Sequence, residues 1–322
     1  CGWRTPCWPK ESSEPVTYGA MERRALVWLL GAAVLWGTTG TAQALGEAEG
    51  SPLSVGAVRL AIGAAGLLVL GWRHLRRTPL RWLAVGAAAM AGYQVAFFAG
   101  VARAGVALGT VVAIGSAPVV AGIADWAVRS EPPTRRWWAA TALAVTGVAL
   151  IAGQPEAVDA GGVALAVAAG VAYAVATLAS KYLVEVVPPT TAMAAMFGVA
   201  AILLAPLLPT ADLRWLGRPA GAAAALWLGL GATTAAYVAF ARGLRFATVG
   251  QAATAGLAEP ATATLLGVLL IGERQPGRAW LGVAAVVVAL TVLATSPVSA
   301  GAATILRGRG PGLRRGRPGR GR

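Results

Sequence analysis

Long apolar runs, each close to the length of a bilayer-spanning helix, recur along the whole chain and constrain its fold more than any other feature. A helix needs about 20 apolar residues to cross roughly 30 Å of hydrocarbon. Charged residues make up only 12% of the chain, whereas ordinary soluble domains contain roughly 25%. We therefore predict an all-α integral membrane protein with about ten transmembrane helices. The predicted spans are residues 25–45, 52–72, 80–101, 105–128, 137–152, 161–184, 190–208, 219–241, 246–271 and 279–296.

The basic residues predict how these spans are oriented. A net charge of +14 would suggest nucleic-acid binding in a soluble protein, but aromatic residues for base stacking are not interleaved with the basic ones. We expect a lipid bilayer and no nucleic acid as partner. Cytoplasmic loops carry an excess of Lys and Arg, and this excess favours a multi-pass protein of the cytoplasmic membrane with both termini in the cytoplasm. The basic residues then predicted inside are Arg23, Arg24, Arg73, Arg76, Arg77, Arg81, Arg129, Arg135, Arg136, Lys181, Arg242, Arg245 and the arginines of 307–322, against Arg103, Arg214, Arg218, Arg274 and Arg278 outside.

Both ends of the chain differ from its centre. Residues 1–20 are polar, contain proline and lack the apolar centre of a signal peptide, so we expect a disordered or spurious extension before Met21. Residues 299–322 form a basic, low-complexity segment that we expect to be disordered. A solvated tail that sets orientation is the simpler interpretation, and contact with anionic lipid or RNA is the alternative.

Residues for catalysis or metal binding are scarce. The two cysteines, Cys1 and Cys7, lie in the N-terminal stretch, and the only histidine, His74, lies among arginines between two spans. We predict no catalytic site, no metal and no cofactor. The sequence also lacks the Gly-rich phosphate-binding motif, so ATP is not expected to drive any activity directly.

The chain repeats itself internally. A shift of 142 residues aligns Phe98 with Phe240, Arg103 with Arg245, Pro118 with Pro260, Glu131 with Glu273, Arg136 with Arg278 and Trp138 with Trp280. A shift of 137 aligns Trp36 with Tyr173 and Pro52 with Pro189. We therefore predict two five-helix repeats, at residues 21–155 and 156–298. Five is an odd number, so the second repeat must be inverted, an arrangement typical of secondary transporters with a substrate site between the repeats.

The repeats also resemble a known family. The residues that carry the resemblance are Pro52 to Arg59, the segment AGLAEPATATLLGVLLIGERQPGRAWLG, and its counterpart from Pro118 to Glu131. They are similar to those of EamA-type transporters of the drug/metabolite transporter superfamily, over roughly residues 25–296. The first copy departs from the pattern, because Ala117 stands where the second copy has Glu259. The resemblance implies export or exchange of small molecules such as amino acids, metabolites or drugs.

Four residues inside the spans are the principal candidates for a transport site. Pro118 and Pro260 each remove a helical hydrogen bond, and interrupted helices at equivalent positions indicate a transport site, although both can be passive kinks. Glu259 lies near the centre of its span, where it can bind a substrate amine, carry a proton, or form a purely structural hydrogen bond. Arg59 can pair with Glu259, bind a substrate carboxylate, or extend to the interface.

A second group of candidates consists of polar or aromatic residues inside spans that can line a cavity or simply pack. These residues are Trp36, Tyr93, Gln94, Tyr173, Tyr237 and Gln251. Asp125 is predicted to be interfacial, and Glu131 and Glu273 to anchor short loops.

The predicted function is secondary active transport of a small organic solute by alternating access, with efflux as the expected direction. Protons are the candidate coupling ion, and homo-oligomerisation stays open. The alternatives are a non-transporting membrane scaffold or regulator and an intramembrane lipid-modifying enzyme.

Overall fold

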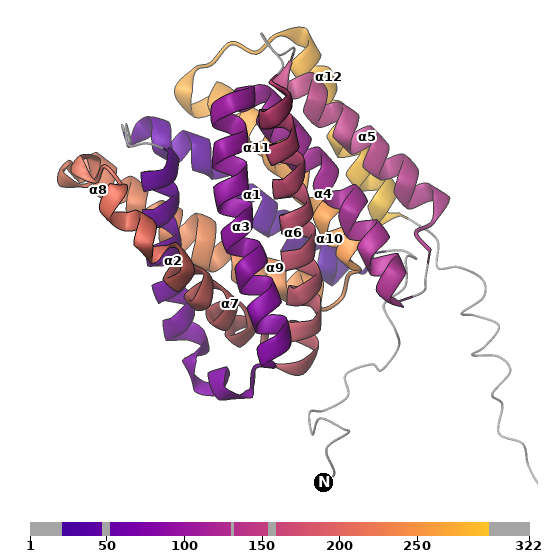
Figure 1. Ribbon diagram of the computed structural model, residues 1–322. Coiled ribbons are helices and arrows are strands. Elements are labelled where there is room, and N and C mark those ends of the chain that lie inside the picture. Colours follow the sequence, from indigo (N-terminus) through magenta and orange to yellow (C-terminus); the bar gives the residue numbers. More distant parts are fainter. Residues whose placement is uncertain (1–20, 47–51, 130–131, 154–158, 296–322) are drawn as a thin grey trace, which may run out of the picture.

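The computed structural model describes residues 21–46, 52–129, 132–153 and 159–295, and helices are the only regular elements in these ranges (Figure 1). The first half contains α1 (Arg23–Leu45), α2 (Pro52–Gly71), η1 (Trp72–Arg77), α3 (Leu80–Ala104), α4 (Val106–Arg129) and α5 (Arg135–Ala152). The second half contains α6 (Ala160–Val186), α7 (Pro189–Leu204), η2 (Ala205–Thr210), η3 (Arg214–Gly217), α8 (Pro219–Leu226), η4 (Trp227–Ala235), α9 (Ala236–Leu244), α10 (Val249–Gly256), α11 (Ala258–Leu266), η5 (Gly267–Ile271) and α12 (Gly277–Ala294). The predicted all-α class is confirmed.

Eight of the described segments are long and apolar enough to cross a membrane. Three of them are composite: Ser54–Arg77 joins most of α2 to η1, Pro219–Leu244 joins α8, η4 and α9, and Val249–Ile271 joins α10, α11 and η5. Together with the shorter α7 and with α5, they make the predicted ten spans. Large apolar side chains lie on the outside, and Leu269 and Val69 are 76% and 75% exposed. Such a surface suits lipid rather than water.

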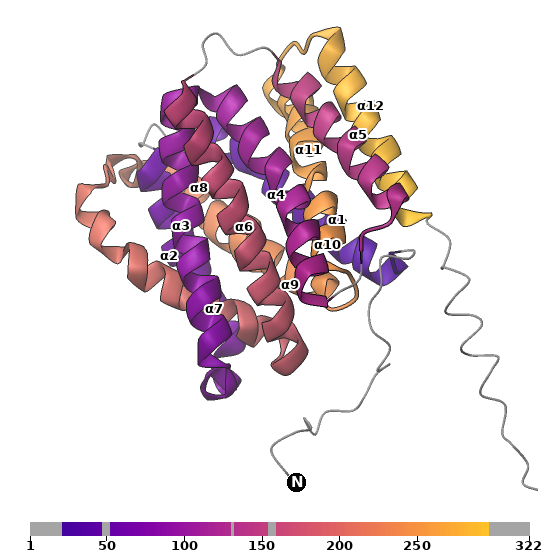
Figure 2. The same ribbon diagram turned by 45° about the vertical axis from the view of Figure 1, so that its right-hand side comes forward.

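Helix packing follows the two inverted repeats. α3 packs against α6, and the equivalent pair, α1 against η4 and α9, recurs in the other half. α4 packs against α6, and α1 in turn packs against α10 and α11. Two further pairs, α2 with α7 and α5 with α12, each combine equivalent helices of the two halves, and α5 and α12 run side by side in Figure 2. A two-fold axis between the halves therefore passes through these two pairs.

Close helix crossings depend on glycine. A Cβ atom on Gly147 of α5 would lie 2.7 Å from the carbonyl oxygen of Gly282 in α12, and a Cβ on Gly282 would meet the carbonyl of Gly147. Small residues permit this approach, which is the usual basis of helix association in membranes. Gly105, in contrast, is not a packing residue: it ends α3 with a φ of 80°, a conformation that glycine adopts readily.

The eighth and ninth spans are interrupted, and the fourth is not. α4 continues through Pro118, whereas the ninth span breaks at Leu257, between α10 and α11. The expectation that both prolines interrupt their spans thus holds only for the ninth. A proline can be absorbed as a bend, and a glycine precedes each of these prolines, Gly115 in α4 and Gly256 in the ninth span, so local composition alone does not decide where a span breaks. In the eighth span, η4 is π-helical, and the hydroxyl of Thr233 donates to the carbonyl of Leu228 five residues earlier, at 2.8 Å.

The two ends of the bundle differ in charge. One end, called the basic end below, carries η1, the starts of α1, α3 and α5, and the connection between α9 and α10, with Arg23, Arg24, Arg73, Arg76, Arg77, Arg81, Arg135, Arg136, Arg242 and Arg245. A hydrogen bond of 2.9 Å from Arg136 to Thr295 places the end of α12 there as well. The opposite end holds all three glycines with positive φ among the described residues, Gly105, Gly153 and Gly272.

Candidate functional site: a cavity between the two repeats

A cavity of about 420 Å³ lies between the two halves of the bundle. Its walls come from the parts of α1, α2, α3 and α4 nearest the opposite end, and from the middle of α6, the eighth span and the ninth span. The cavity therefore extends from the centre of the bundle toward the opposite end. The lining residues are Trp36, Gly37, Thr39, Gly40, Gln43, Val55, Gly56, Arg59, Tyr93, Gln94, Phe97, Phe98, Thr110, Ala113, Ile114, Ala117, Tyr173, Tyr237, Ala253, Gly256, Glu259 and Ala263.

Two charged residues face this cavity from opposite halves. Arg59 lies on α2 in the first half, and Glu259 lies on α11 in the second half, two residues after the break at Leu257. They are close enough for their charges to interact. Among the described residues, however, neither side chain forms a hydrogen bond or an ion pair within 4.0 Å. The cavity thus holds two opposite charges that the protein does not join directly.

Aromatic rings form the floor of the cavity, on the side of the basic end. Trp36 lies 5.1 Å from Tyr237 and 5.5 Å from Phe240, measured between ring centroids, and Tyr237 lies 4.3 Å from Phe197. On the wall, Tyr93 packs against Tyr173 of the other half at 5.6 Å. Aromatic pairs at these distances stabilise the packing of the helices beneath the cavity.

Two residues that line the cavity have buried polar atoms without protein partners. The indole Nε1 of Trp36 and the hydroxyl of Thr39 are buried, and neither has a hydrogen-bond partner in the part of the chain that the structure describes. The two prolines contribute in the same way. Pro118 and Pro260 cannot donate to the carbonyls of Ile114 and Gly256, and both of those residues line the cavity. These two carbonyls therefore lack the backbone donor that a regular helix would supply.

Seven of the eight predicted candidates line this cavity, and Gln251 does not. Gln251 is 1% exposed, and its side-chain oxygen accepts from the backbone N–H of Thr248 at 3.0 Å. The Thr248 hydroxyl accepts from the Gln251 N–H in return, which makes a capping box at the start of α10. Gln251 is a capping residue here, because its place in the first turn directs it to the helix end.

Sequence reasoning missed several lining residues that helical spacing could have found. Gly40 and Gln43 lie four and seven residues after Trp36, and Phe97 lies four residues after Tyr93. Residues at these spacings share one face of a helix. Thr110, Ala113 and Ala117 form a similar stripe on α4.

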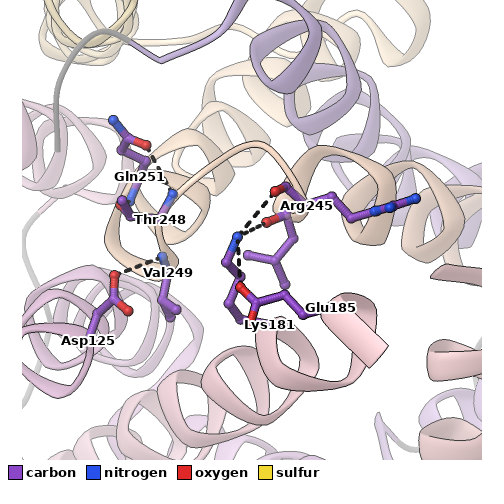
Figure 3. A network of polar contacts seen from close by, with 8 residues as sticks. Asp125, Lys181, Glu185, Arg245, Thr248, Val249 and Gln251 are labelled. Carbon is purple, nitrogen blue, oxygen red and sulfur yellow. Dashed lines mark hydrogen bonds and ion pairs between the residues drawn. The ribbon is translucent and has the colours of Figure 1, made fainter. Parts of the chain in front are cut away.

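The basic end is closed by a packed core. The largest buried cluster joins Leu29, Leu67, Met90, Leu183 and Leu244, in the halves of their helices nearest this end, with Phe197 at the middle of α7. Below it, polar contacts hold the connection between α9 and α10 (Figure 3). The ammonium of Lys181 on α6 donates to the carbonyls of Leu244 and Arg245 at 2.8 and 3.2 Å, and it lies 3.6 Å from the carboxylate of Glu185.

Asp125 anchors the same connection from α4. Its carboxylate accepts from the backbone N–H of Val249 at 3.2 Å (Figure 3). Asp125 and Lys181 are each only 1% exposed, so both charged side chains are covered by protein, although each lies near the end of its predicted span. Each lies near the end of its own helix, where the α9–α10 connection covers it. Glu131 lies outside the described residues, and Glu273 is exposed and accepts from Gln275 at 2.9 Å.

Ten spans in two inverted halves, with a cavity between them, define a polytopic membrane transporter. The chain belongs to the EamA-like transporter family, whose sequence model matches residues 23–153 and again residues 160–295. The predicted family resemblance is thereby confirmed.

Comparisons with individual proteins agree with this assignment. A relative from Bacillus subtilis (strain 168), the uncharacterized transporter YwfM, is 44% identical over 277 residues, which cover 84% of this chain and 94% of the relative. A solved crystal structure superposes with a TM-score of 0.73 at 21% identity, covering 83% of this chain and 95% of that chain. At this identity the second comparison shows the fold alone.

Proposed function

We propose that this protein is a secondary active transporter that moves a small organic solute across the cytoplasmic membrane by alternating access, with efflux as the net direction. The observation that carries the proposal is the cavity between two inverted repeats, with Arg59 and Glu259 on its wall and a packed core beneath it. Two similar halves of opposite orientation can exchange conformations, and the cavity then faces the other side of the membrane.

The basic end is proposed to face the cytoplasm, as its arginines favour. The described conformation then has the cytoplasmic side closed by the core around Leu183 and Phe197 and by the contacts of Lys181 and Asp125. Opening toward the cytoplasm requires the α9–α10 connection to leave these two residues. Closing the opposite end requires α1 and α3 to approach their neighbours in the other half.

Glu259 is the proposed site of coupling. A carboxylate within the membrane is costly when it is ionised without a partner, so it favours binding a proton or a substrate amine. If the two compete for it, proton entry from one side releases the solute on that side, and the proton gradient drives transport. Family membership points to transport rather than to a scaffold or a lipid-modifying enzyme.

The proposal is tested by an uptake screen in proteoliposomes, with and without a proton gradient, using amino acids, purines and cationic drugs. We expect saturable uptake of at least one of these classes above the rate of protein-free liposomes, and acceleration by the gradient. Folded, correctly inserted protein that moves none of them faster than protein-free liposomes would contradict transport. Saturable uptake that no gradient accelerates would contradict the active mechanism alone.

A further inference from the structure

We infer that the connection between α2 and α3 binds an anionic phospholipid, such as phosphatidylglycerol, from the leaflet at the basic end. The binding site is a group of four arginines, here called the η1 cluster: Arg73, Arg76, Arg77 and Arg81. The inference does not depend on transport, because the η1 cluster lies on the surface of the bundle and outside the cavity. Three observations carry it: the unbalanced charge of the cluster, its place at the end of a span, and the apolar side chains beside it.

The charge of the η1 cluster is not balanced by carboxylates. Four arginines lie within the nine residues 73–81, and the sequence contains no Asp or Glu from residue 51 to residue 124. All four arginines are exposed, and within the described ranges none of them forms an ion pair. η1 is a 3₁₀-helix, so Arg73 and Arg76, three residues apart, lie on the same face. Their like charges repel each other, and an anion bound between them is favoured.

The other half of the protein lacks this charge at the equivalent place. At the shift of 137, residues 73–81 correspond to residues 210–218, in the connection between α7 and α8. That segment contains Arg214 and Arg218 together with Asp212, so two positive charges and one negative charge give +1, against +4 for the η1 cluster. A charge of +4 is therefore not required to join two spans of this fold.

The η1 cluster lies where a span ends. The apolar segment that begins at Ser54 ends at Arg77, and the next span begins at Leu80. Phospholipid headgroups occupy this boundary between hydrocarbon and water. A guanidinium group can pair with a phosphate through two parallel hydrogen bonds, which makes arginine well suited to a phospholipid headgroup.

Apolar side chains beside the cluster fit the hydrocarbon part of the same lipid. Trp72 and Leu80 are 62% and 77% exposed, and Val69 and Leu70 on the membrane side of the cluster are exposed as well. Acyl chains would cover these side chains, and tryptophan is typical of the membrane interface. A free phosphate ion would leave all of them uncovered. The combination of arginines and apolar residues therefore favours a phospholipid over a soluble anion.

The protein holds the η1 cluster in place at both of its ends. The hydroxyl of Thr191 on α7 donates to the carbonyl of Gly71 at 3.1 Å, just before η1 begins. At the other end, the guanidinium of Arg81 lies 4.8 Å from the ring centroid of Trp82, which stacks on Tyr182 of α6 at 4.1 Å. The chain that presents the arginines is already supported, so binding requires less ordering.

Lipid binding can be measured by native mass spectrometry of the full chain in a neutral detergent, titrated with phosphatidylglycerol or with phosphatidylcholine of the same acyl chains. Arg76→Gln combined with Arg77→Gln should weaken binding of the first phosphatidylglycerol at least about tenfold, because each basic residue near an anionic headgroup contributes to binding. Binding of phosphatidylcholine should stay within about twofold, since its headgroup has no net charge. An unchanged affinity for phosphatidylglycerol would overturn the inference.

The matched control is Arg23→Gln combined with Arg24→Gln. It removes two exposed arginines at the same end of the bundle, but next to Glu22 and outside the η1 cluster. Its affinity for phosphatidylglycerol should stay within about twofold of the wild type. The arginines of 307–322 are the same in all of these proteins, so the differences between them report on the η1 cluster. Equal weakening in both double variants would show an effect of net charge only and would contradict a site.

Two further variants test the cluster and its apolar border. Arg73→Gln combined with Arg81→Gln removes the other two charges and should also weaken phosphatidylglycerol binding at least about tenfold. Trp72→Ser combined with Leu80→Ser should weaken it at least about threefold, because the acyl chains lose apolar contact. Inorganic phosphate at millimolar concentration should not displace the lipid. Binding of inorganic phosphate or of a single-stranded oligonucleotide more tightly than phosphatidylglycerol, through the same arginines, would show that the cluster is not a lipid site.

Discussion

The ammonium group of Lys181 lies 2.8 Å from the carbonyl oxygen of Leu244, so a charged group that is 99% buried closes the C-terminal end of α9. A cation at this position satisfies carbonyls that have no helical partner and complements the negative end of the helix. The contact also joins α6 to the eighth span at the basic end. It therefore stabilises the end of α9 and helps to keep the basic end of the bundle closed beneath the cavity.

Replacing Lys181 with Met should loosen the basic end, because the carbonyls of Leu244 and Arg245 lose a charged donor. Such hydrogen bonds contribute about 1.5–3 kcal/mol. A cysteine introduced at Ala247, which is fully buried in the wild type, should then be labelled at least about fivefold faster by a thiol reagent, equivalent to about 1 kcal/mol. The background for this measurement has Cys1 and Cys7 replaced by Ser.

The control for this experiment is Glu185→Gln. The Glu185 side chain is 41% exposed, and this substitution leaves both hydrogen bonds from Lys181 to the carbonyls of Leu244 and Arg245 in place. In the Glu185→Gln variant, the cysteine at position 247 should be labelled at a rate within about twofold of that in the parent. Equal rates in the Lys181→Met variant and the parent would show that Lys181 does not hold the closure.

Asp125→Ala should destabilise the protein, because it removes the acceptor for the N–H of Val249 at the start of α10. A buried donor left without a partner costs about 1–3 kcal/mol. Asp212→Ala is the matched control: Asp212 also accepts from a backbone N–H, that of Arg214 at 3.0 Å, but in an exposed loop. Thermal unfolding in detergent should show a clear drop in Tm for Asp125→Ala alone. Similar Tm values for both variants would contradict an anchoring role.

Glu259→Gln should abolish net transport while expression and thermal stability stay near those of the wild type. Gln keeps the size and hydrogen-bonding capacity of Glu but cannot exchange a proton or pair ionically with an amine. Uptake should be measured across an external pH of about 5 to 8, a range that brackets the titration of a buried carboxylate. The control is Glu22→Gln, in an exposed residue before α1 that forms no side-chain cap. A Glu259→Gln rate and pH profile equal to those of the wild type would leave Glu259 a structural residue only.

Gly37→Ala should disturb the cavity, and Gly40→Ala should not. A Cβ at Gly37 would lie 2.6 Å from the Cβ of Thr262 and 2.9 Å from the carbonyl oxygen of Glu259, so α1 and α11 would have to separate. We expect a cost of about 1–3 kcal/mol in stability and weaker solute binding. Gly40 lies one turn further along the same cavity wall and has nothing within 4 Å of the added atom. Its substitution should be neutral or stabilising, since Ala favours helix. Equal Tm and affinity in the two variants would contradict this difference.

Much of the architecture follows from local patterns. Each span could be predicted because a bilayer demands a continuous apolar run. The inverted repeat follows from matches such as Pro118 with Pro260 and Trp138 with Trp280, which recur at one shift. The same patterns indicated seven of the residues that line the cavity, because a polar or aromatic side chain within a span needs a non-lipid surrounding. That Arg59 and Glu259 line the cavity was therefore predictable from their depth in the spans.

Only the tertiary structure decided which residues meet at a given depth. Spacing along a helix predicts how deep a residue lies, but not which neighbouring helix it faces or what covers its end. Asp125 and Lys181 lie near helix ends and would be interfacial in isolated helices, yet the α9–α10 connection buries both. Gln251 lies within its predicted span, but the start of α10 at Val249 makes it a capping residue. The ninth span breaks at Leu257, whereas α4 continues through Pro118. A proline removes one helical hydrogen bond in both spans, and the surrounding tertiary packing decides whether the helix bends or breaks there.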